Sequence, residues 1–106
     1  MKRCYVCGPM SRRKRRHVED RFNAAARVLR ATGWDVMLPT QSEERDRASF
    51  VRRDLDMIQS LEAYTEDAVV VLPGHELTGG CHAEVAVARW LRLRVLTLEE
   101  ALDDDI

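Results

Sequence analysis

The sequence predicts an α/β protein, a three-layer α/β/α domain in which helices cover both faces of a four-stranded parallel sheet. Three observations predict this class. Short apolar runs, such as Ala68 to Leu72, alternate with longer segments in which apolar residues recur at helical spacing. Glycine and proline stand where the short runs stop, as in Gly8-Pro9 and Pro73-Gly74. The 106 residues contain no repeat, linker or low-complexity segment, so we expect one domain over residues 1–106.

Four strands are expected, each ending at or near a turn-forming residue or the next helix. They are residues 3–7, 34–38, 67–72 and 94–98. Strands that alternate with helices form parallel sheets with right-handed crossovers. We expect the strand order 2-1-3-4, a flavodoxin-like or Rossmann-like arrangement. In this order the loops after strands 1 and 3, residues 8–16 and 73–80, face one another across the switch point.

Three helices and a short terminal turn are expected between and after the strands. The first has apolar residues at helical spacing and ends before Gly33; these residues are Val18, Phe22, Ala25, Ala26 and Leu29. The second, residues 48–63, has an apolar stripe formed by Phe50, Val51, Leu55 and Ile58. The third is expected at residues 81–93 and the terminal turn at residues 99–102.

The charge balance argues against a general nucleic-acid-binding protein, because 17 Lys and Arg nearly match 18 Asp and Glu. The distribution is nevertheless uneven, since residues 12–16 are all basic and Asp103 to Asp105 are all acidic. The basic run is interpreted as an anion site or as a solvated turn, with a nucleic-acid contact as a weaker alternative. No apolar run reaches about 18 residues, so we expect no membrane partner.

The three cysteines form an odd set, which together with the lack of a signal peptide indicates a reducing cytoplasm. Cys4-x-x-Cys7 has the spacing of half a metal site, but residues three apart in a strand point to opposite faces. Cys81 and His82 lie far along the chain, so no second pair completes a zinc pattern. We therefore expect no metal and no cofactor, and interpret Cys4 and Cys7 as small buried hydrophobes.

Asp54 is out of place on the second helix, because it lies within the apolar stripe, four residues from both Phe50 and Ile58. A carboxylate that faces a sheet is costly unless it is paired. Two explanations are open. Asp54 forms a salt bridge, for example to Arg53, or lies near the open end of the helix; alternatively, it lines a cleft and hydrogen-bonds a substrate hydroxyl.

Glu84 follows a strand and a loop that contains Gly79 and Gly80, and we expect it in the first turn of the third helix. There the helix dipole and unpaired amides favour a carboxylate, which is a structural role by itself. The same surroundings would hold the carboxylate ionised, as a nucleophile or an electrostatic stabiliser requires. The two glycines would let a ligand approach the backbone closely.

The loop Gly8-Pro9-Met10-Ser11 follows a strand and precedes a helix, where exposed amides collect anions. It lacks the Walker lysine pattern and the dinucleotide-binding glycine pattern, so neither ATP nor NAD binding is supported. One phosphate group would suit it. Tyr5, on the strand before this loop, is either a core residue or a hydroxyl directed at the cleft.

Four segments, in order, resemble the nucleoside 2-deoxyribosyltransferase superfamily, in particular its short phage and bacterial branch. They are Tyr5 to Ser11, Arg53-Asp54-Leu55, Asp67 to Gly74, and Thr78-Gly79-Gly80 followed by Glu84, Ala86 and Ala88. The nucleoside 5'-monophosphate N-glycosidases are similar too. The resemblance covers residues 5–98.

The resemblance implies a double displacement at C1' of a nucleoside or nucleotide. Glu84 is then the nucleophile, Asp54 contacts the sugar and the leaving base, and Tyr5 orients the nucleophile. Thr78 contacts the sugar or its 5' substituent. The implied phosphate-binding residues are Gly8, Pro9, Met10, Ser11 and Arg12, and the other implied substrate contacts are His75, Gly79 and Gly80. Asp67 is interpreted as structural.

We therefore expect a nucleotide-processing enzyme that cleaves or exchanges an N-glycosidic bond. The basic loop favours a phosphorylated substrate, and so a hydrolase that releases free base over a transferase. Relatives complete their sites with residues of a neighbouring subunit, which implies a homodimer or higher oligomer, with Trp90 as an interface anchor. The rival hypothesis is a non-catalytic nucleotide-binding module with the same cleft.

Overall fold

The computed structural model describes residues 2–9, 15–39, 47–74 and 79–104, and the statements below concern these residues. Four strands form one sheet, and all of its pairings are parallel. The order β2-β1-β3-β4 confirms the predicted arrangement. The strands are β1 (Arg3–Cys7), β2 (Asp35–Met37), β3 (Ala68–Val71) and β4 (Arg94–Thr97). Cys4 lies opposite Ala68 and Cys7 opposite Val71, so β1 and β3 pair along the whole of β3.

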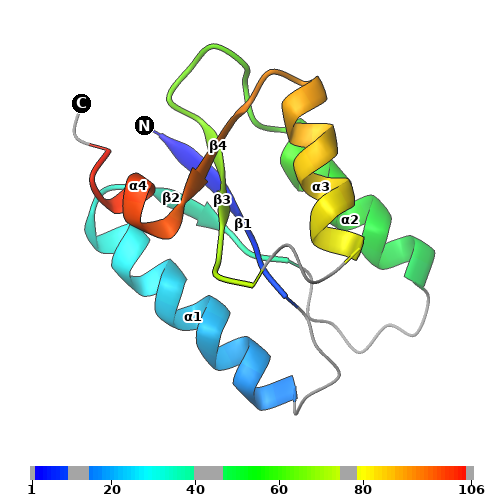
Figure 1. Cartoon of the computed structure of the whole chain (residues 1–106), viewed down its shortest axis with the longest axis horizontal. Coiled ribbons are helices and arrows are strands. Elements are labelled where there is room, and N and C mark those ends of the chain that lie inside the picture. The colour runs from blue at the N-terminus through cyan, green and yellow to red at the C-terminus, as the bar shows by residue number, and fades with distance from the viewer. Residues whose placement is uncertain (1, 10–14, 40–46, 75–78, 105–106) are drawn as a thin grey trace.

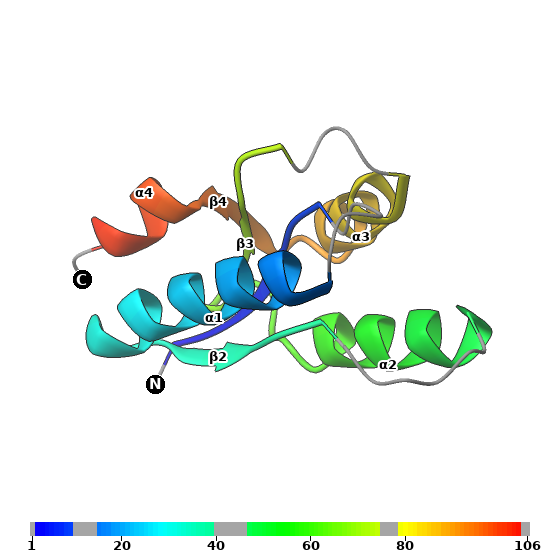
Figure 2. The same ribbon diagram turned by 90° about the horizontal axis from the view of Figure 1, so that it is seen from below.

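Helices cover both faces of this sheet, as Figures 1 and 2 show. One face carries α1 (Arg15–Ala31) and α4 (Leu98–Leu102), and the other carries α2 (Arg47–Gln59) and α3 (Gly79–Trp90). None of the described helices is long and apolar enough to cross a membrane.

Each face of the sheet has its own core, because side chains alternate along the strands. Cys4 and Val6 pack with the buried stripe of α1. Tyr5 and Cys7 face the other way and pack with Ile58 of α2 and with α3. The prediction that Cys4 and Cys7 are buried on opposite faces is confirmed, since both side chains are fully buried.

Helix α1 shows why the sequence pattern predicts the first layer well. Its predicted stripe is buried in the core apart from Val18, which is partly buried. The helix ends where Gly33 adopts φ +99°, a left-handed conformation that glycine enters without strain. Trp34 then lies against α4, and its indole nitrogen donates to the Ala101 carbonyl at 3.1 Å.

The prediction for α2 is wrong in part. The helix ends at Gln59 instead of residue 63, since the chain turns at Ser60 towards β3. Val51, placed on the apolar stripe by its spacing, is 47% exposed, while Leu55 and Ile58 pack in the core. The first half of α2 extends past the sheet (Figure 2), so the apolar face predicted for it has no strand to pack against. The side chain of Phe50 lies outside the described residues.

The prediction for α3 is wrong at both ends. The helix begins at Gly79 rather than Cys81, so Gly79 and Gly80 belong to its first turn instead of a loop. It ends at Trp90 rather than residue 93, because Arg92 adopts φ 63° and the Leu93 amide bonds back to Ala88 at 2.9 Å. The early start moves Glu84 to the sixth residue of the helix, beyond its first turn.

Candidate functional site

The carboxyl ends of β1 and β3 bring together residues that are far apart in the sequence. Tyr5 and Cys7 project from β1 towards α3, which follows β3. The Tyr5 hydroxyl donates to Oε2 of Glu84 at 2.7 Å, and the sulfur of Cys7 lies 3.4 Å from Oε1 of the same carboxylate. Each oxygen of Glu84 therefore has its own partner from β1.

Glu84 is half-buried, and this burial raises the pKa of its carboxyl above the ordinary value. Hydrogen bonds from Tyr5 and Cys7 act in the opposite direction, and the nearby charge of Asp54 raises the pKa further. We predicted from the sequence that the first helical turn would keep this carboxylate ionised. That prediction is wrong, because Glu84 lies beyond the turn whose amides are free. Neutral donors hold the carboxylate instead.

Tyr5 remains a hydrogen-bond donor because its pKa is raised far above the ordinary value. Burial is the main cause, and the charges of Glu84 and Asp54 add to it. Of the two roles open for Tyr5, the structure shows the first: the residue is fully buried in the core, and its hydroxyl is used there to hold Glu84.

Asp54 is half-buried on α2, the helix that packs beside α3. Its charge acts on both Tyr5 and Glu84, which puts the three residues in one neighbourhood. The two carboxylates that sequence reasoning singled out thus lie within electrostatic range of each other, although 30 positions separate them.

Gly8, directly after β1, contributes its backbone to the surroundings of the cluster. A β-carbon at this position would lie 3.1 Å from the Leu72 side chain, so glycine permits the close approach of the two loops. The carbonyl of Gly8 accepts a hydrogen bond from the Cys81 thiol at 2.9 Å. Pro9 is partly exposed beside it.

Of the remaining predicted substrate contacts, the structure describes only Gly79 and Gly80. Met10, Ser11, Arg12, His75 and Thr78 lie outside the described residues. Gly79 and Gly80 begin α3, one turn before Glu84, and no atom lies near the position of a β-carbon on Gly80.

Sequence reasoning missed the two thiols beside Glu84. It interpreted Cys7 as a small buried hydrophobe and set Cys81 apart as distant in the sequence, whereas the sulfur of Cys7 lies near that of Cys81. A signal for this grouping exists. Cys7 shares a strand face with Tyr5, two residues before it, and Cys81 precedes Glu84 by about one helical turn.

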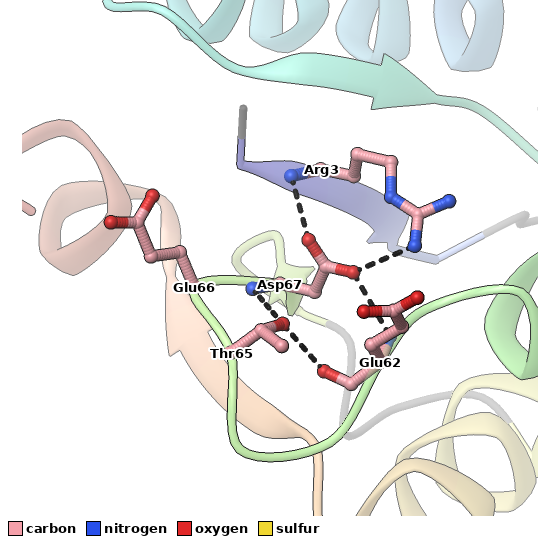
Figure 3. Close-up of a pocket in the computed structure, with 5 residues that line it drawn as sticks. All are labelled: Arg3, Glu62, Thr65, Glu66 and Asp67. Atoms are coloured by element: carbon pink, nitrogen blue, oxygen red, sulfur yellow. Dashed lines mark hydrogen bonds and ion pairs between the residues drawn. The ribbon is translucent and has the colours of Figure 1, made fainter.

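A polar depression lies at the opposite end of the sheet (Figure 3), lined by Arg3, Glu62, Thr65, Glu66 and Asp67. Asp67 is 5% exposed and accepts hydrogen bonds from the backbone amides of Arg3 at 3.0 Å and Glu62 at 2.9 Å. The guanidinium of Arg3 adds an ion pair at 2.9 Å. These groups satisfy one another, so we assign the depression a structural role, as predicted for Asp67.

The fold and this cluster define a small parallel α/β domain with polar side chains gathered at the carboxyl edge of its sheet. Residues 2–97 match the family described as "Domain of unknown function (DUF4406)", and the chain belongs to this family. Comparison with curated proteins finds no match.

Proposed function

We propose that the protein cleaves or exchanges the N-glycosidic bond of a nucleoside 5'-monophosphate, with Glu84 as the nucleophile. The observation that carries the proposal is the hydrogen bond of 2.7 Å between the Tyr5 hydroxyl and Glu84. These are the two residues to which the superfamily resemblance gives the roles of orienting group and nucleophile. The neighbouring charge of Asp54 supports the same assignment.

The reaction consists of two displacements at C1'. An oxygen of Glu84 forms a bond to C1' as the bond from C1' to the base nitrogen breaks, and the base leaves with the electron pair and takes up a proton. Asp54 anchors the sugar and, in its protonated form, gives the base that proton. Water, or a second base, then attacks C1' and returns a proton to the Asp54 carboxylate, while the Glu84 carboxylate leaves with the electron pair of its bond to C1'.

The surroundings of Glu84 suit a nucleophile in three ways. Tyr5 and Cys7 fix the orientation of the carboxylate without neutralising its charge, because both donors are uncharged. Burial raises the pKa of the carboxyl, so the ionised form is more basic than an exposed glutamate. Burial also leaves the charge poorly solvated, which favours its attack on an electron-poor carbon.

We propose a hydrolase rather than a transferase, because the basic run after Gly8 favours a phosphorylated substrate. The experiment is incubation with a panel of nucleoside monophosphates, with and without an acceptor base, followed by chromatography. Free base without an acceptor supports the hydrolase. Exchange only when an acceptor is present supports the transferase.

The decisive variant is Glu84→Ala, which we expect to lower base release by roughly 10³-fold or more while circular dichroism stays unchanged. Glu62→Gln is a matched control, since its side chain is exposed at the opposite end of the sheet. Full activity of Glu84→Ala would show that the assignment is wrong. Calorimetric binding of a monophosphate without base release over hours would favour the binding module instead.

We also propose that the protein acts as a homo-oligomer that includes Trp90 in its interface. The side chain of Trp90 is 87% exposed at the end of α3, and Leu91 beside it is 39% exposed. A large exposed aromatic residue is typical of an interface anchor. We expect Trp90→Ala to shift the protein towards the monomer in sedimentation experiments. An unchanged distribution of species would exclude Trp90 from an interface.

A further inference from the structure

Cys7, Cys81 and Glu84 form a compact set of metal-ligand atoms. The two sulfurs and a carboxylate oxygen all lie within 4.8 Å of one another. Cys7 ends β1, while Cys81 and Glu84 lie one turn apart on α3, so two rigid elements support the set. None of the three cysteines forms a disulfide in the structure.

The spacing of these atoms is close to that of a tetrahedral zinc site. With Zn–S bonds of about 2.3 Å and Zn–O bonds of about 2.0–2.2 Å, neighbouring ligand atoms lie about 3.5–3.8 Å apart. The distance of 3.4 Å between the Cys7 sulfur and Oε1 of Glu84 already matches this spacing. The other two distances between ligand atoms would have to shorten by at most about 1 Å, which is within reach of side-chain rotation. The three ligand atoms would then occupy three corners of the tetrahedron.

The chemistry of the set also favours zinc over harder cations. Thiolates are soft ligands that select zinc and copper, whereas calcium and magnesium prefer oxygen alone. Binding would release the two thiol protons, and the positive charge of the ion would then balance the negative charges of the two buried thiolates.

Neighbouring groups would hold these ligands in place. Oε2 of Glu84 accepts the hydrogen bond from Tyr5, which leaves Oε1 directed at Cys7. Such a bond to the second oxygen orients a carboxylate ligand. In the metal-free protein the Cys81 thiol donates to the Gly8 carbonyl at 2.9 Å. This bond is given up when zinc replaces the thiol proton.

We propose that Cys7, Cys81 and Glu84 bind one zinc ion, with solvent or a small ligand in the fourth position. Three protein ligands and one exchangeable position are the pattern of an open zinc site. The inference does not depend on the proposed function, because it concerns binding alone. If both hold, zinc occupies the carboxylate that attacks C1', and the ion inhibits base release.

The first test uses the unmodified protein. The chain is reduced with a phosphine, freed of metal and titrated with Zn²⁺ and, separately, Co²⁺. We expect one ion per chain, a thiolate-to-cobalt charge-transfer band, and X-ray absorption with two sulfurs at about 2.3 Å from zinc. A zinc shell of nitrogen and oxygen only, or no binding at micromolar zinc, would overturn the proposal.

The second test uses matched variants. Cys7→Ser and Cys81→Ser should each lower zinc affinity by more than about a hundredfold and reduce the charge-transfer band, since removal of an outer hydrogen-bond partner alone typically costs about 10- to 100-fold. Cys4→Ser is the control, since Cys4 lies on the same strand but faces the opposite core. Equal affinity of the Cys4 and Cys7 variants would contradict the site. Metal affinity and base release are measured separately, so a negative result for the zinc site can be distinguished from a negative result for the proposed activity.

Discussion

Asp67 and Glu84 are two carboxylates shielded from solvent in the same small domain, and they are held in opposite ways. Asp67, before β3, accepts hydrogen bonds from two backbone amides and from the charged Arg3. Burial acts to raise its pKa, but these donors outweigh it, and the pKa lies below the ordinary value. Glu84, beyond the other end of the sheet, accepts hydrogen bonds from the Tyr5 hydroxyl and the Cys7 thiol, and burial raises its pKa above the ordinary value.

The difference separates a carboxylate that stabilises the fold from one that remains available for chemistry. Donors around Asp67 favour its charge, so ionisation contributes to stability there. Donors around Glu84 orient the group but compensate its buried charge incompletely. Functional carboxylates are commonly held in the way that Glu84 is, with a charge that is incompletely compensated, so that the protein is less stable but the group is more reactive.

The largest expected effect is on activity. Glu84→Gln keeps the shape of the side chain and should lower base release by roughly 10³-fold or more, because an amide does not attack C1'. Asp67→Asn should change the activity of each folded molecule by less than about threefold, since it lies away from the cluster. Rates are normalised to folded protein by circular dichroism. Comparable losses in both variants would remove the distinction between the two carboxylates.

The second effect is on stability, and here the Asp67 variant should lose more than the Glu84 variant. Asp67→Asn should lower the free energy of unfolding by about 2 kcal/mol, since the bonds to charged and backbone donors weaken while Arg3 is partly exposed. For a domain of this size that corresponds to about 10 °C in melting temperature. Glu84→Gln should melt at or above the wild-type temperature at neutral pH, because it removes an incompletely compensated charge. A large loss for Glu84→Gln would mark it as structural.

The third effect separates orientation from packing. Tyr5→Phe keeps the buried ring but removes the hydroxyl that orients Glu84. We expect kcat to fall about 10- to 100-fold with little change in KM, as when a catalytic group is misplaced. Val6→Ala, a cavity variant on the same strand that faces the other core, should lower stability without this loss of kcat. A loss of kcat in both variants would point to general disruption.

The smallest effect is a pH dependence specific to Asp67. Its folded pKa lies below the value of about 3.9 in an unfolded chain. Its stabilising contribution is therefore present above about pH 4 and is lost as the pH falls through the folded pKa. The difference in melting temperature between wild type and Asp67→Asn should shrink below about pH 4. A difference that is constant from pH 7 to strong acid would contradict this origin.

The sequence predicted the fold well because its patterns are local and strong. Alternation in β1, the stripe of α1 and the turn at Gly33 each depend on neighbouring residues. Errors occur where tertiary context decides. Val51 has core spacing but lies in the part of α2 that extends past the sheet, and α3 begins with Gly79 and Gly80, two residues of low helix propensity.

The candidate site was predictable only in part. Topology brought Tyr5 and Glu84 to one edge, as expected from the strand order. The resemblance implied Tyr5 as a partner of Glu84, but Cys7 was not predicted, because position within a helix decides whether free amides or side chains hold a carboxylate. The grouping of Cys7 with Cys81 was missed for a related reason: residues 74 positions apart meet only through the pairing of β1 with β3.

The hydrogen bond from Tyr5 to Glu84 also has a consequence for folding. It joins residues 79 positions apart, across the pairing of β1 with β3 and the whole of the intervening chain. Contacts of such high sequence separation form after local ones, because closing a long loop costs entropy before the contact is gained. Strand β1 comes first in the chain, yet Tyr5 on this strand gains its partner Glu84 only when α3 has packed against the sheet. The site should therefore report complete folding, and an amino-terminal fragment that ends before α3 should retain helix but no activity.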